Sequence, residues 1–389
     1  MKNSISRKDQ SKFTDSMLRF LISAIQTKSL SNQEEQMAHL LYDTMKTLEY
    51  DSVVIDSTGN VLGRIGSGPV KVLFDSHMDT VDVLYESEWK YPPFSAAVAD
   101  GRIWGRGSVD MKSSLAASVY AAAAAKELHL TDGLTIYVSG TVDEEFSDGE
   151  SLKMMLSEAG ITPDYAVICE PSDNDIAIGH NGKALVSITT KGISSHGSEP
   201  RSGRNAVYEM NKVLSRIEEI SNISGTIAVT NIHSDSVSIN AVPQFCGICI
   251  DRRLSLAESK ETLTQEMDRI VSETSASWQI NPLIRKSWRG REIHYMPMHE
   301  PWSISEEHPL ARTCAGSYEK TFGKKPNSFR FWNFSTNAVA TVGLGIPTIG
   351  FGPGNPMMCH KTDENCQIEK IQDAFCFYLN LIKELNSRQ

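Results

Sequence analysis

The sequence predicts an α/β protein with a mostly parallel sheet flanked by helices, and a smaller ferredoxin-like domain inserted into it. Strands and helices alternate along residues 70–170 and again from residue 309, as they do in a sheet covered on both faces. Between these stretches, residues 182–295 follow the order β-α-β-β-α-β, which is the ferredoxin-like arrangement. The chain has 389 residues, which is long for one core and sufficient for two domains.

Composition and charge exclude several classes of protein. No apolar run approaches the ~20 residues of a membrane-spanning helix, so no membrane partner is expected. Residues 1–10 are polar and charged and contain no apolar signal-peptide core, so a cytoplasmic location is expected. The net charge of -10 argues against a nucleic-acid partner, because phosphate binding requires a basic surface.

The first part of the chain opens with two amphipathic helices. Apolar residues recur at helical spacing over residues 10–28 and 32–48, and Ser31 followed by Glu34 resembles a capping box. Apolar and β-rich runs predict strands at residues 52–56, 60–65, 70–76, 135–142 and 165–169. Helical patterns lie among the later strands, at residues 111–129 and 148–159.

The pattern changes near residue 182 and changes back near residue 295. Strands are predicted at 184–191, 226–232, 245–251 and 278–284, and helices at 205–220 and 257–273. From residue 309 the predicted elements are a helix to 322, a strand at 329–332, a helix at 337–342, a strand at 347–351 and a helix at 367–385. We therefore interpret residues 182–295 as an inserted domain between two parts of the first, 1–181 and 296–389.

The seven cysteines are odd in number and scattered, which favours reduced thiols. Cys246 and Cys249 form a C-x-x-C pair inside a predicted strand. Positions i and i+3 of a strand face opposite sides of the sheet, so this pair is interpreted as structural rather than metal-binding.

Three predicted strands end on a histidine or an acidic residue, namely His77, the pair Glu144–Glu145, and Glu170. In open parallel sheets, ligands bind outside the carboxyl ends of the strands. Glu170 follows four apolar residues, and a carboxylate at that depth requires a partner such as a cation. The sequence therefore predicts a site at this edge of the sheet.

His77 and Asp79 lie two residues apart at a strand end and so project from the same face. Asp79 can then accept the free ring N–H of His77 and fix its tautomer as a metal ligand. By itself the H-x-D pattern is common and also fits a polar strand end.

Asp110 stands in a glycine-flanked turn, with Gly105 and Gly107 allowing close approach of the backbone to a ligand. Its two carboxylate oxygens can bind one metal ion each. Asp110 also stands where a cap of the following helix would lie, and the two roles are compatible.

Glu144 and Glu145 would diverge on extended backbone, so that one can bind a metal while the other faces an attacking water. Adjacent acidic residues are also common on solvated surfaces. His360 follows a Gly/Pro-rich loop, residues 352–356, which is a flexible carrier for a ligand.

With these residues in place, the sequence resembles the M20 family of metallopeptidases and amidohydrolases, which includes acetylornithine deacetylase, succinyl-diaminopimelate desuccinylase and carboxypeptidase G. The matching motifs span nearly the whole chain in the family's order: Ser76–Asp79, Gly105–Lys112, Asp143–Glu145, Cys169–Pro171, Ser195–His196 with Gly203–Ala206, and His360. The resemblance implies a dinuclear-zinc-peptidase-like fold in which residues 182–295 form a lid and dimerisation domain.

The resemblance also implies two divalent metal ions, zinc by preference, with cobalt or manganese able to substitute. Both ions would share Asp110, and the implied ligand sets are His77, Asp110 and Glu170 for one ion, and Asp110, Glu145 and His360 for the other. Glu144 would be the general base.

In the lid, the resemblance implies that His196 stabilises the oxyanion, often across a homodimer. Asn240 and Arg253 match substrate contacts, and an arginine suits a carboxylate. Arg252 could exchange roles with Arg253. The resemblance further predicts a cis peptide bond at Asp110–Met111.

The expected reaction is hydrolysis of an amide bond, chiefly the deacylation of an N-acyl amino acid or a related small amide. A dipeptidase or carboxypeptidase on the same site is the alternative. A catalytically silent binding protein would be expected to lack ligands or the base, and this chain retains them all. The segment Phe334–Asn337 and Cys359 depart from the family pattern, which leaves the acyl group and the amine undetermined.

Overall fold

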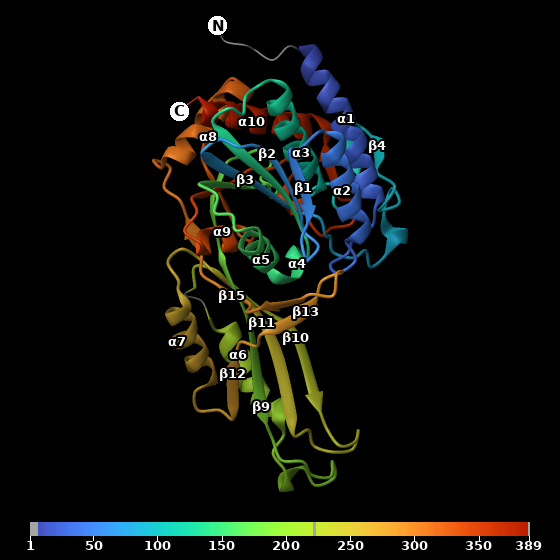
Figure 1. Ribbon diagram of the computed structural model, residues 1–389. Coiled ribbons are helices and arrows are strands. Elements are labelled where there is room, and N and C mark those ends of the chain that lie inside the picture. The colour runs from blue at the N-terminus through green and yellow to red at the C-terminus, as the bar shows by residue number, and fades with distance from the viewer. Residues whose placement is uncertain (1–6, 221–222, 388–389) are drawn as a thin grey trace.

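The computed structural model describes residues 7–220 and 223–387, with side chains from residue 12 onward. Figure 1 shows a broad layered part that contains α1, α3 and α10, and a narrower part whose long strands extend away from it. Among the described helices, none combines the length and the apolar character that a membrane crossing requires.

A nine-stranded sheet forms the centre of the broad part. Its order is β1 (Ser52–Ile55), β2 (Val61–Gly66), β6 (Leu134–Thr141), β3 (Val70–His77), β7 (Tyr165–Ile168), β18 (Thr348–Gly350), β8 (Ala177–His180) and β16 (Trp302–Ser303), with β17 (Arg330–Trp332) paired to β8. The four central strands, β6, β3, β7 and β18, are parallel. Every residue of β6 is buried, as expected for a strand covered on both faces. The predicted fold class is confirmed.

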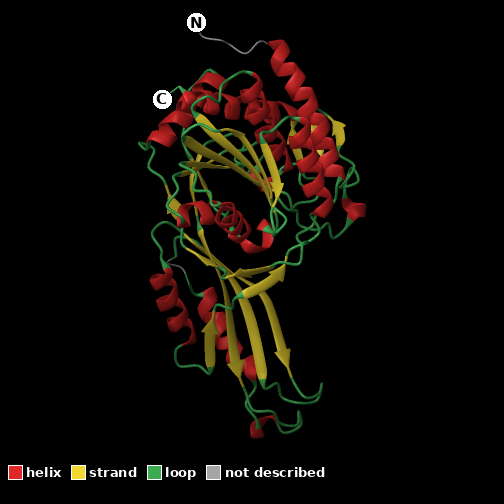
Figure 2. Cartoon of the chain, in the orientation of Figure 1, coloured by secondary structure: helices red, strands yellow, loops and turns green. Residues whose placement is uncertain are grey.

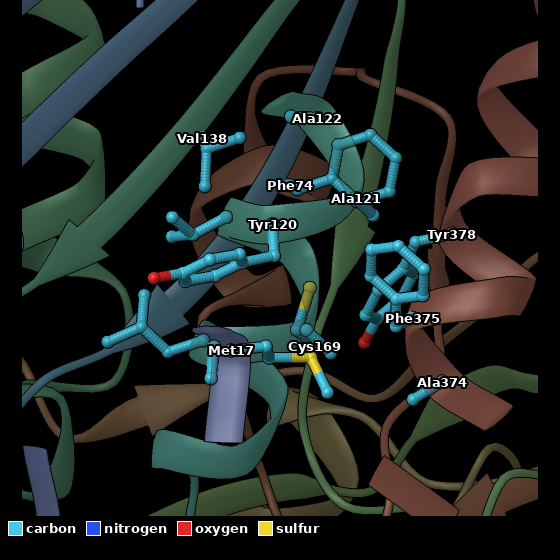
Figure 3. Close-up of a cluster of buried hydrophobic side chains, with 14 of the residues drawn as sticks. Met17, Phe74, Tyr120, Ala121, Ala122, Val138, Cys169, Ala374, Phe375 and Tyr378 are labelled. Atoms are coloured by element: carbon cyan, nitrogen blue, oxygen red, sulfur yellow. The ribbon is translucent and has the colours of Figure 1, made fainter. Parts of the chain in front are cut away.

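Helices cover both faces of this sheet. One face packs against α1 (Arg7–Gln26), α2 (Glu35–Thr47), α3 (Lys112–Glu127), α8 (Pro309–Phe322) and α10 (Ile368–Asn386). The other face packs against α5 (Glu150–Ala159) and α9 (Ala338–Gly343). Figure 3 shows how the alanines of α3 leave room for Phe74 and Val138 from the sheet and for Phe375 and Tyr378 from α10.

A small three-stranded sheet joins distant parts of the chain. Its strands are β19 (Asn365–Gln367), β5 (Arg102–Trp104) and β4 (Ala97–Ala99). Since β19 pairs with β5, the loop that carries Asp110 lies beside the segment that carries His360. The short 3₁₀ turns are η1 (Glu86–Glu88), η2 (Pro200–Ser202) and η3 (Pro356–Met358).

The narrow part contains a second sheet with antiparallel neighbours, seen as long yellow arrows in Figure 2. Its order is β10 (Thr226–Asp235), β11 (Phe245–Leu254), β9 (Gly182–Lys191) and β12 (Ala276–Gln279), with β15 (Met298–His299) also on β9. One face packs against α6 (Ala206–Glu218) and α7 (Lys260–Val271). These elements follow the order β-α-β-β-α-β; the limits 182–295 for a separate domain stay a prediction.

Two local predictions are wrong. The single strand expected at 278–284 is interrupted, because Pro282 has no N–H to donate to a ladder. Its second half, β13 (Leu283–Lys286), pairs instead with β14 (Glu292–Tyr295) in a separate hairpin. The expected capping box is absent, since the Ser31 hydroxyl donates to Asp79 and no side chain caps α2.

The C-x-x-C pair lies on β11, where Cys246 is buried and Cys249 is exposed. Opposite faces of one strand account for this difference, as the spacing predicts.

Candidate metal centre and active site

The carboxyl ends of the four central parallel strands meet at one edge of the large sheet. His77 is the last residue of β3, Glu144 and Glu145 follow β6, and Glu170 follows β7. The loop after β18 carries His360. Parallel strands end at the same edge, so residues up to 283 positions apart in sequence come together there.

Asp110 lies between two histidines. Its Oδ1 is 2.9 Å from His77 Nε2, and its Oδ2 is 3.2 Å from His360 Nε2. His77 Nε2 is also 3.7 Å from Glu170 Oε1, and His360 Nε2 is 3.0 Å from Glu145 Oε2. The two carboxylate oxygens of Asp110 therefore face two different histidines, and a carboxylate that bridges two metal ions has this geometry.

The donor atoms are close enough to hold metal ions. Those of His77, Asp110 and Glu145 lie within 4.8 Å of one another, and so do those of His77, Glu144 and Glu170. These two groups differ from the expected ligand sets. In one group His77 takes the place of His360, and in the other Glu144 takes the place of Asp110. Imidazole nitrogen and carboxylate oxygen are donors that zinc, cobalt and manganese accept. The donor set fits divalent cations.

The charges of this cluster are unbalanced without a cation. Burial raises the pKa of Glu144 well above its usual range, and the charge of Glu170 raises it further. Burial likewise raises the pKa of Glu170, with a further contribution from Asp110. Hydrogen bonds to Asp110 and Glu145 raise the pKa of His360 to about 10. Buried carboxylates in such surroundings retain their charge only with positive partners.

Asp79 acts differently from the sequence expectation. The Nδ1 atom of His77 lies 2.8 Å from the backbone carbonyl of Asp79, whereas the nearest carboxylate oxygen is 3.5 Å away. The peptide carbonyl is thus the nearer acceptor for the ring N–H. The carboxylate instead accepts the backbone N–H groups of Glu144 and Glu145, at 3.1 and 3.2 Å.

The backbone of the acidic pair is helical rather than extended. Asp143 adopts a φ of 57°, and α4 (Glu144–Ser147) begins directly after it. Because Asp79 accepts the first two N–H groups of this turn, it satisfies donors that a helix start leaves free. The expectation of diverging side chains on a strand is therefore wrong, and both side chains reach the cluster.

The loop before α3 is held by a buried carboxylate, Glu364, that no sequence motif singled out. Glu364 accepts the backbone N–H groups of Val109 and Asp110, at 2.8 and 3.1 Å, and pairs with Arg106 at 2.6 Å. Asp110 does not cap α3, whose N-cap is Met111. The Asp110–Met111 peptide bond is cis, as predicted. The position of Glu364 four residues after His360 is the only signal that could have identified it.

A cavity of about 290 Å³ opens beside the cluster. Its lining comes from both sheets and comprises Asp110, Glu144, Glu145, Asp148, Glu170, Lys183, Arg253, Phe334, Ser335, Pro356, Cys359 and His360. Asp148 and Lys183 were not selected from the sequence. They form an ion pair, with Lys183 Nζ 2.7 Å from Asp148 Oδ2.

The residues predicted in the inserted region have different surroundings. Arg253 lines the cavity, whereas Arg252 is buried in ion pairs with Glu258 and Glu266. His196 is exposed and does not line the cavity of its own chain. The exposed residue Asn240 lies beside it, since its carbonyl accepts the N–H of Gly197.

A parallel α/β sheet whose strand ends gather the buried His77, the exposed His360 and several carboxylates defines a metallohydrolase. The chain belongs to peptidase family M20/M25/M40, whose model matches residues 73–384.

Three similar proteins illustrate the range of the family. The chain is 35% identical to the uncharacterized protein YgeY of Escherichia coli K12, over 90% of this chain and 89% of the relative. It is 25% identical to a probable succinyl-diaminopimelate desuccinylase of Staphylococcus epidermidis, and the match covers 95% of this chain and 96% of the relative. The crystal structure of the M20 family metallo-carboxypeptidase Sso-CP2 from Sulfolobus solfataricus has the same fold, with a TM-score of 0.78 and 17% sequence identity. The match covers 96% of this chain and 100% of that one.

Proposed function

We propose that the protein is a dinuclear metal-dependent hydrolase that deacylates an N-acyl amino acid or a related small amide. The observation that carries the proposal is the position of Asp110, with one carboxylate oxygen toward His77 and the other toward His360. The similarity to a probable desuccinylase supports an acyl group as one half of the substrate. A dipeptide is the alternative substrate on the same site.

One divalent ion would be held by His77, Asp110 and Glu170. A second would be held by Asp110, Glu145 and His360. Both ions would supply Lewis acidity toward the scissile carbonyl. Zinc is the first candidate, because the donors are imidazole and carboxylate. In this proposal, Asp79 orients His77 through its carbonyl and α4 through its carboxylate.

Glu144 is the candidate general base. Its side chain is buried at the cavity wall, and its pKa is raised by burial and then by the charge of Glu170. A carboxylate in this position can remove a proton from water and return it to the leaving amine. Because α4 begins at Glu144, the carboxylate is held by a short backbone segment rather than by a long mobile loop.

His196 and Asn240 would act in the site of a second copy of the chain, because both are exposed and neither lines the cavity of its own chain. The edge strand β10 offers a surface for such pairing, since Val229 and Ile232 on it are 38% and 56% exposed. Unpaired edge strands with apolar residues favour association with another chain. We therefore infer a homodimer through the second sheet.

The experiment is metal analysis of the purified protein, followed by hydrolysis of a panel of N-acyl amino acids and dipeptides. We expect about two divalent ions per chain and release of the amine from at least one N-acyl amino acid. The Glu144→Gln variant should retain its metal and lose turnover by about 10²-fold or more. The matched control, Glu150→Gln on α5, should behave as the wild type. Full activity of Glu144→Gln would refute the assigned base, and a metal-free, active protein would refute the proposed function.

A further inference from the structure

The helical turn that carries the candidate base is short and is flanked by unusual backbone. α4 has four residues, and the residues on either side of it, Asp143 and Asp148, are left-handed, with φ of 57° and 34°. Residues other than glycine adopt this conformation at a cost, so surrounding contacts must hold it in place. Besides the hydrogen bonds to Asp79, the positions of Glu144 and Glu145 therefore depend on what packs against the two ends of this turn.

The hairpin of β13 and β14 presents one face to α4. In its register Arg285 lies opposite Ile293, and Tyr295 lies two positions further along the same strand. Such residues point to the same face of a hairpin, whereas the alternate residues, Lys286 among them, are exposed. Between the two strands, the Trp288 indole donates to a backbone carbonyl in the loop between β1 and β2, at 3.3 Å. Figure 1 shows β13 near α4, where the narrow part meets the broad part.

Arg285 contacts α4 and the residue before it. Its Nε lies 3.5 Å from Oδ1 of Asp143, and its guanidinium carbon lies 4.1 Å from the centre of the Phe146 ring. A planar guanidinium can pair with a carboxylate and stack on an aromatic ring at the same time. The amide oxygen of Asn32 accepts from Nη2, and from Nε at 3.0 Å, which orients the guanidinium.

The carboxylate of Asp143 depends on this arginine. Its side chain is completely buried, and among the described residues its one ion pair is with Arg285. A buried charge requires a partner, and removal of one member of such a pair leaves the other uncompensated. Loss of the guanidinium would therefore disturb the residue that directly precedes Glu144.

Tyr295 holds the other end of the same turn. Its hydroxyl donates to Oδ2 of Asp148, and its ring centre lies 6.4 Å from that of Phe146. Phe146 thus lies against both strands of the hairpin, with the guanidinium of Arg285 on one and the ring of Tyr295 on the other. The hairpin therefore contacts the start, the middle and the end of the segment that carries the acidic pair.

We propose that Arg285 is a positioning residue for the hydrolytic reaction, which keeps the carboxylates of Glu144 and Glu145 in the cluster. The inference rests on the proposed function and adds a residue from outside the cavity, since Arg285 does not line it. Arg285 acts through Asp143 and Phe146, the residues directly before and after the acidic pair. A displacement of about 1 Å can lower a rate by about 100-fold, so this contact affects catalysis without touching the substrate.

The first measurement compares kcat and KM of the metal-saturated wild type and Arg285→Met on the best substrate of the panel. We expect kcat to fall by about 10- to 100-fold while KM stays within about 2-fold, because Arg285 does not line the cavity. Arg285→Lys keeps a charge beside Asp143 and should recover part of kcat. Lys286→Met is the matched control, because it removes a neighbouring cation that is exposed on the other face.

The second measurement does not depend on catalysis. Hydrogen exchange of the purified protein is followed by mass spectrometry on peptides that cover α4 and its flanking residues. Exchange there should be about 10-fold faster in Arg285→Met than in the wild type, and unchanged over the buried strand β6. Lys286→Met should match the wild type. If Arg285→Met does not fold, Arg285→Lys gives a smaller change in the same direction, because it lacks the stacking on Phe146.

Three outcomes would overturn the inference. They are an unchanged kcat in a folded Arg285 variant, unchanged exchange at α4, and exchange that rises equally in β6, which would show a general effect on stability. Absence of hydrolysis by the wild type on the whole panel would refute the proposed function instead. In that case the exchange measurement would still decide whether Arg285 holds the turn.

Discussion

The carboxylate of Asp79 lies 3.1 Å from the backbone nitrogen of Glu144, while the carbonyl of the same residue lies 2.8 Å from Nδ1 of His77. One residue therefore orients a candidate metal ligand and the turn that carries the candidate base. Its side chain is completely buried, so each of these contacts is shielded from water.

Asp79→Ala should lower metal affinity and kcat, each by about 10- to 100-fold, because the start of α4 loses its acceptor. Metal content and steady-state kinetics are the measurements. Asp79→Asn keeps one acceptor oxygen and should lose less. Ser31→Ala removes only a hydroxyl that donates to Asp79 at 2.7 Å and is the control. Equal activity of Asp79→Ala and the wild type would contradict this account.

Removal of the metal ions should destabilise the fold as well as abolish activity. Without cations, the buried carboxylates of Glu144 and Glu170 and the half-buried carboxylate of Glu145 repel one another. Ions present at 1,000 times their dissociation constant stabilise the native state by about 4 kcal/mol per site. We expect chelation to lower Tm and re-addition of zinc, cobalt or manganese to restore it, measured by calorimetry. A Tm that is indifferent to chelation would show that this cluster holds no metal.

Glu34 predicts a pH dependence of stability. Its side chain is buried, and burial, followed by the charge of Asp79, raises its pKa from 4.5 to about 8. The native chain therefore keeps a proton that the unfolded chain releases near pH 4.5, so native stability falls as pH rises from about 5 to 8. The free energy of unfolding falls by a few kcal/mol at most over this range, since one pKa unit corresponds to about 1.4 kcal/mol.

Glu34→Gln removes this titration and keeps the oxygen that accepts the N–H groups of Asn32 and Asp143. The free energy of unfolding of the variant, relative to the wild type, should therefore increase between pH 5 and pH 8. Denaturant unfolding at several pH values measures it. Glu35→Gln, at an exposed position, is the control. Parallel pH profiles of Glu34→Gln and the wild type would disprove the assignment.

The edge strand β10 predicts the mode of association. Ile232→Lys places a charge on an exposed apolar edge and should convert the proposed dimer to a monomer. Sedimentation velocity is the measurement. Ile284→Lys changes an isoleucine of similar exposure, 58% against 56%, on β13 instead, and should leave the dimer intact. A wild type that sediments as a monomer at all concentrations would rule out this interface.

Action of His196 across the dimer can be tested by mixing subunits. Neither Glu144→Gln nor His196→Ala should be active alone. In a mixed dimer, one site has an intact Glu144 and receives His196 from the other subunit. Random exchange of subunits should then restore about a quarter of wild-type activity, because half of the dimers are mixed and each has one complete site. No recovery after verified exchange would place the action of His196 within its own chain.

Much of the fold and most of the candidate centre could be predicted from local patterns. Apolar runs that end on His77 or Glu170 indicate where buried strands stop, and parallel strands stop at a common edge. The backbone conformation at two positions was harder to predict from local sequence patterns. The turn at Asp143 is in contact with Asp79, which is distant in sequence. The break in the strand expected at 278–284 has a local cause instead, because Pro282 has no N–H to donate to a ladder.

The sequence by itself determined the order of the candidate metal ligands, because most of them stand at the end of a strand or in a glycine turn that their own neighbours specify. Only the tertiary structure decided which of Arg252 and Arg253 lines the cavity. Only the tertiary structure placed Lys183 opposite Arg253 on the neighbouring strand. Successive residues of a strand point to opposite faces, and the packing of α6 and α7 selects which face is covered. The register of β9 against β11 then selects the partner. Neither choice is encoded within a few residues of the side chains concerned.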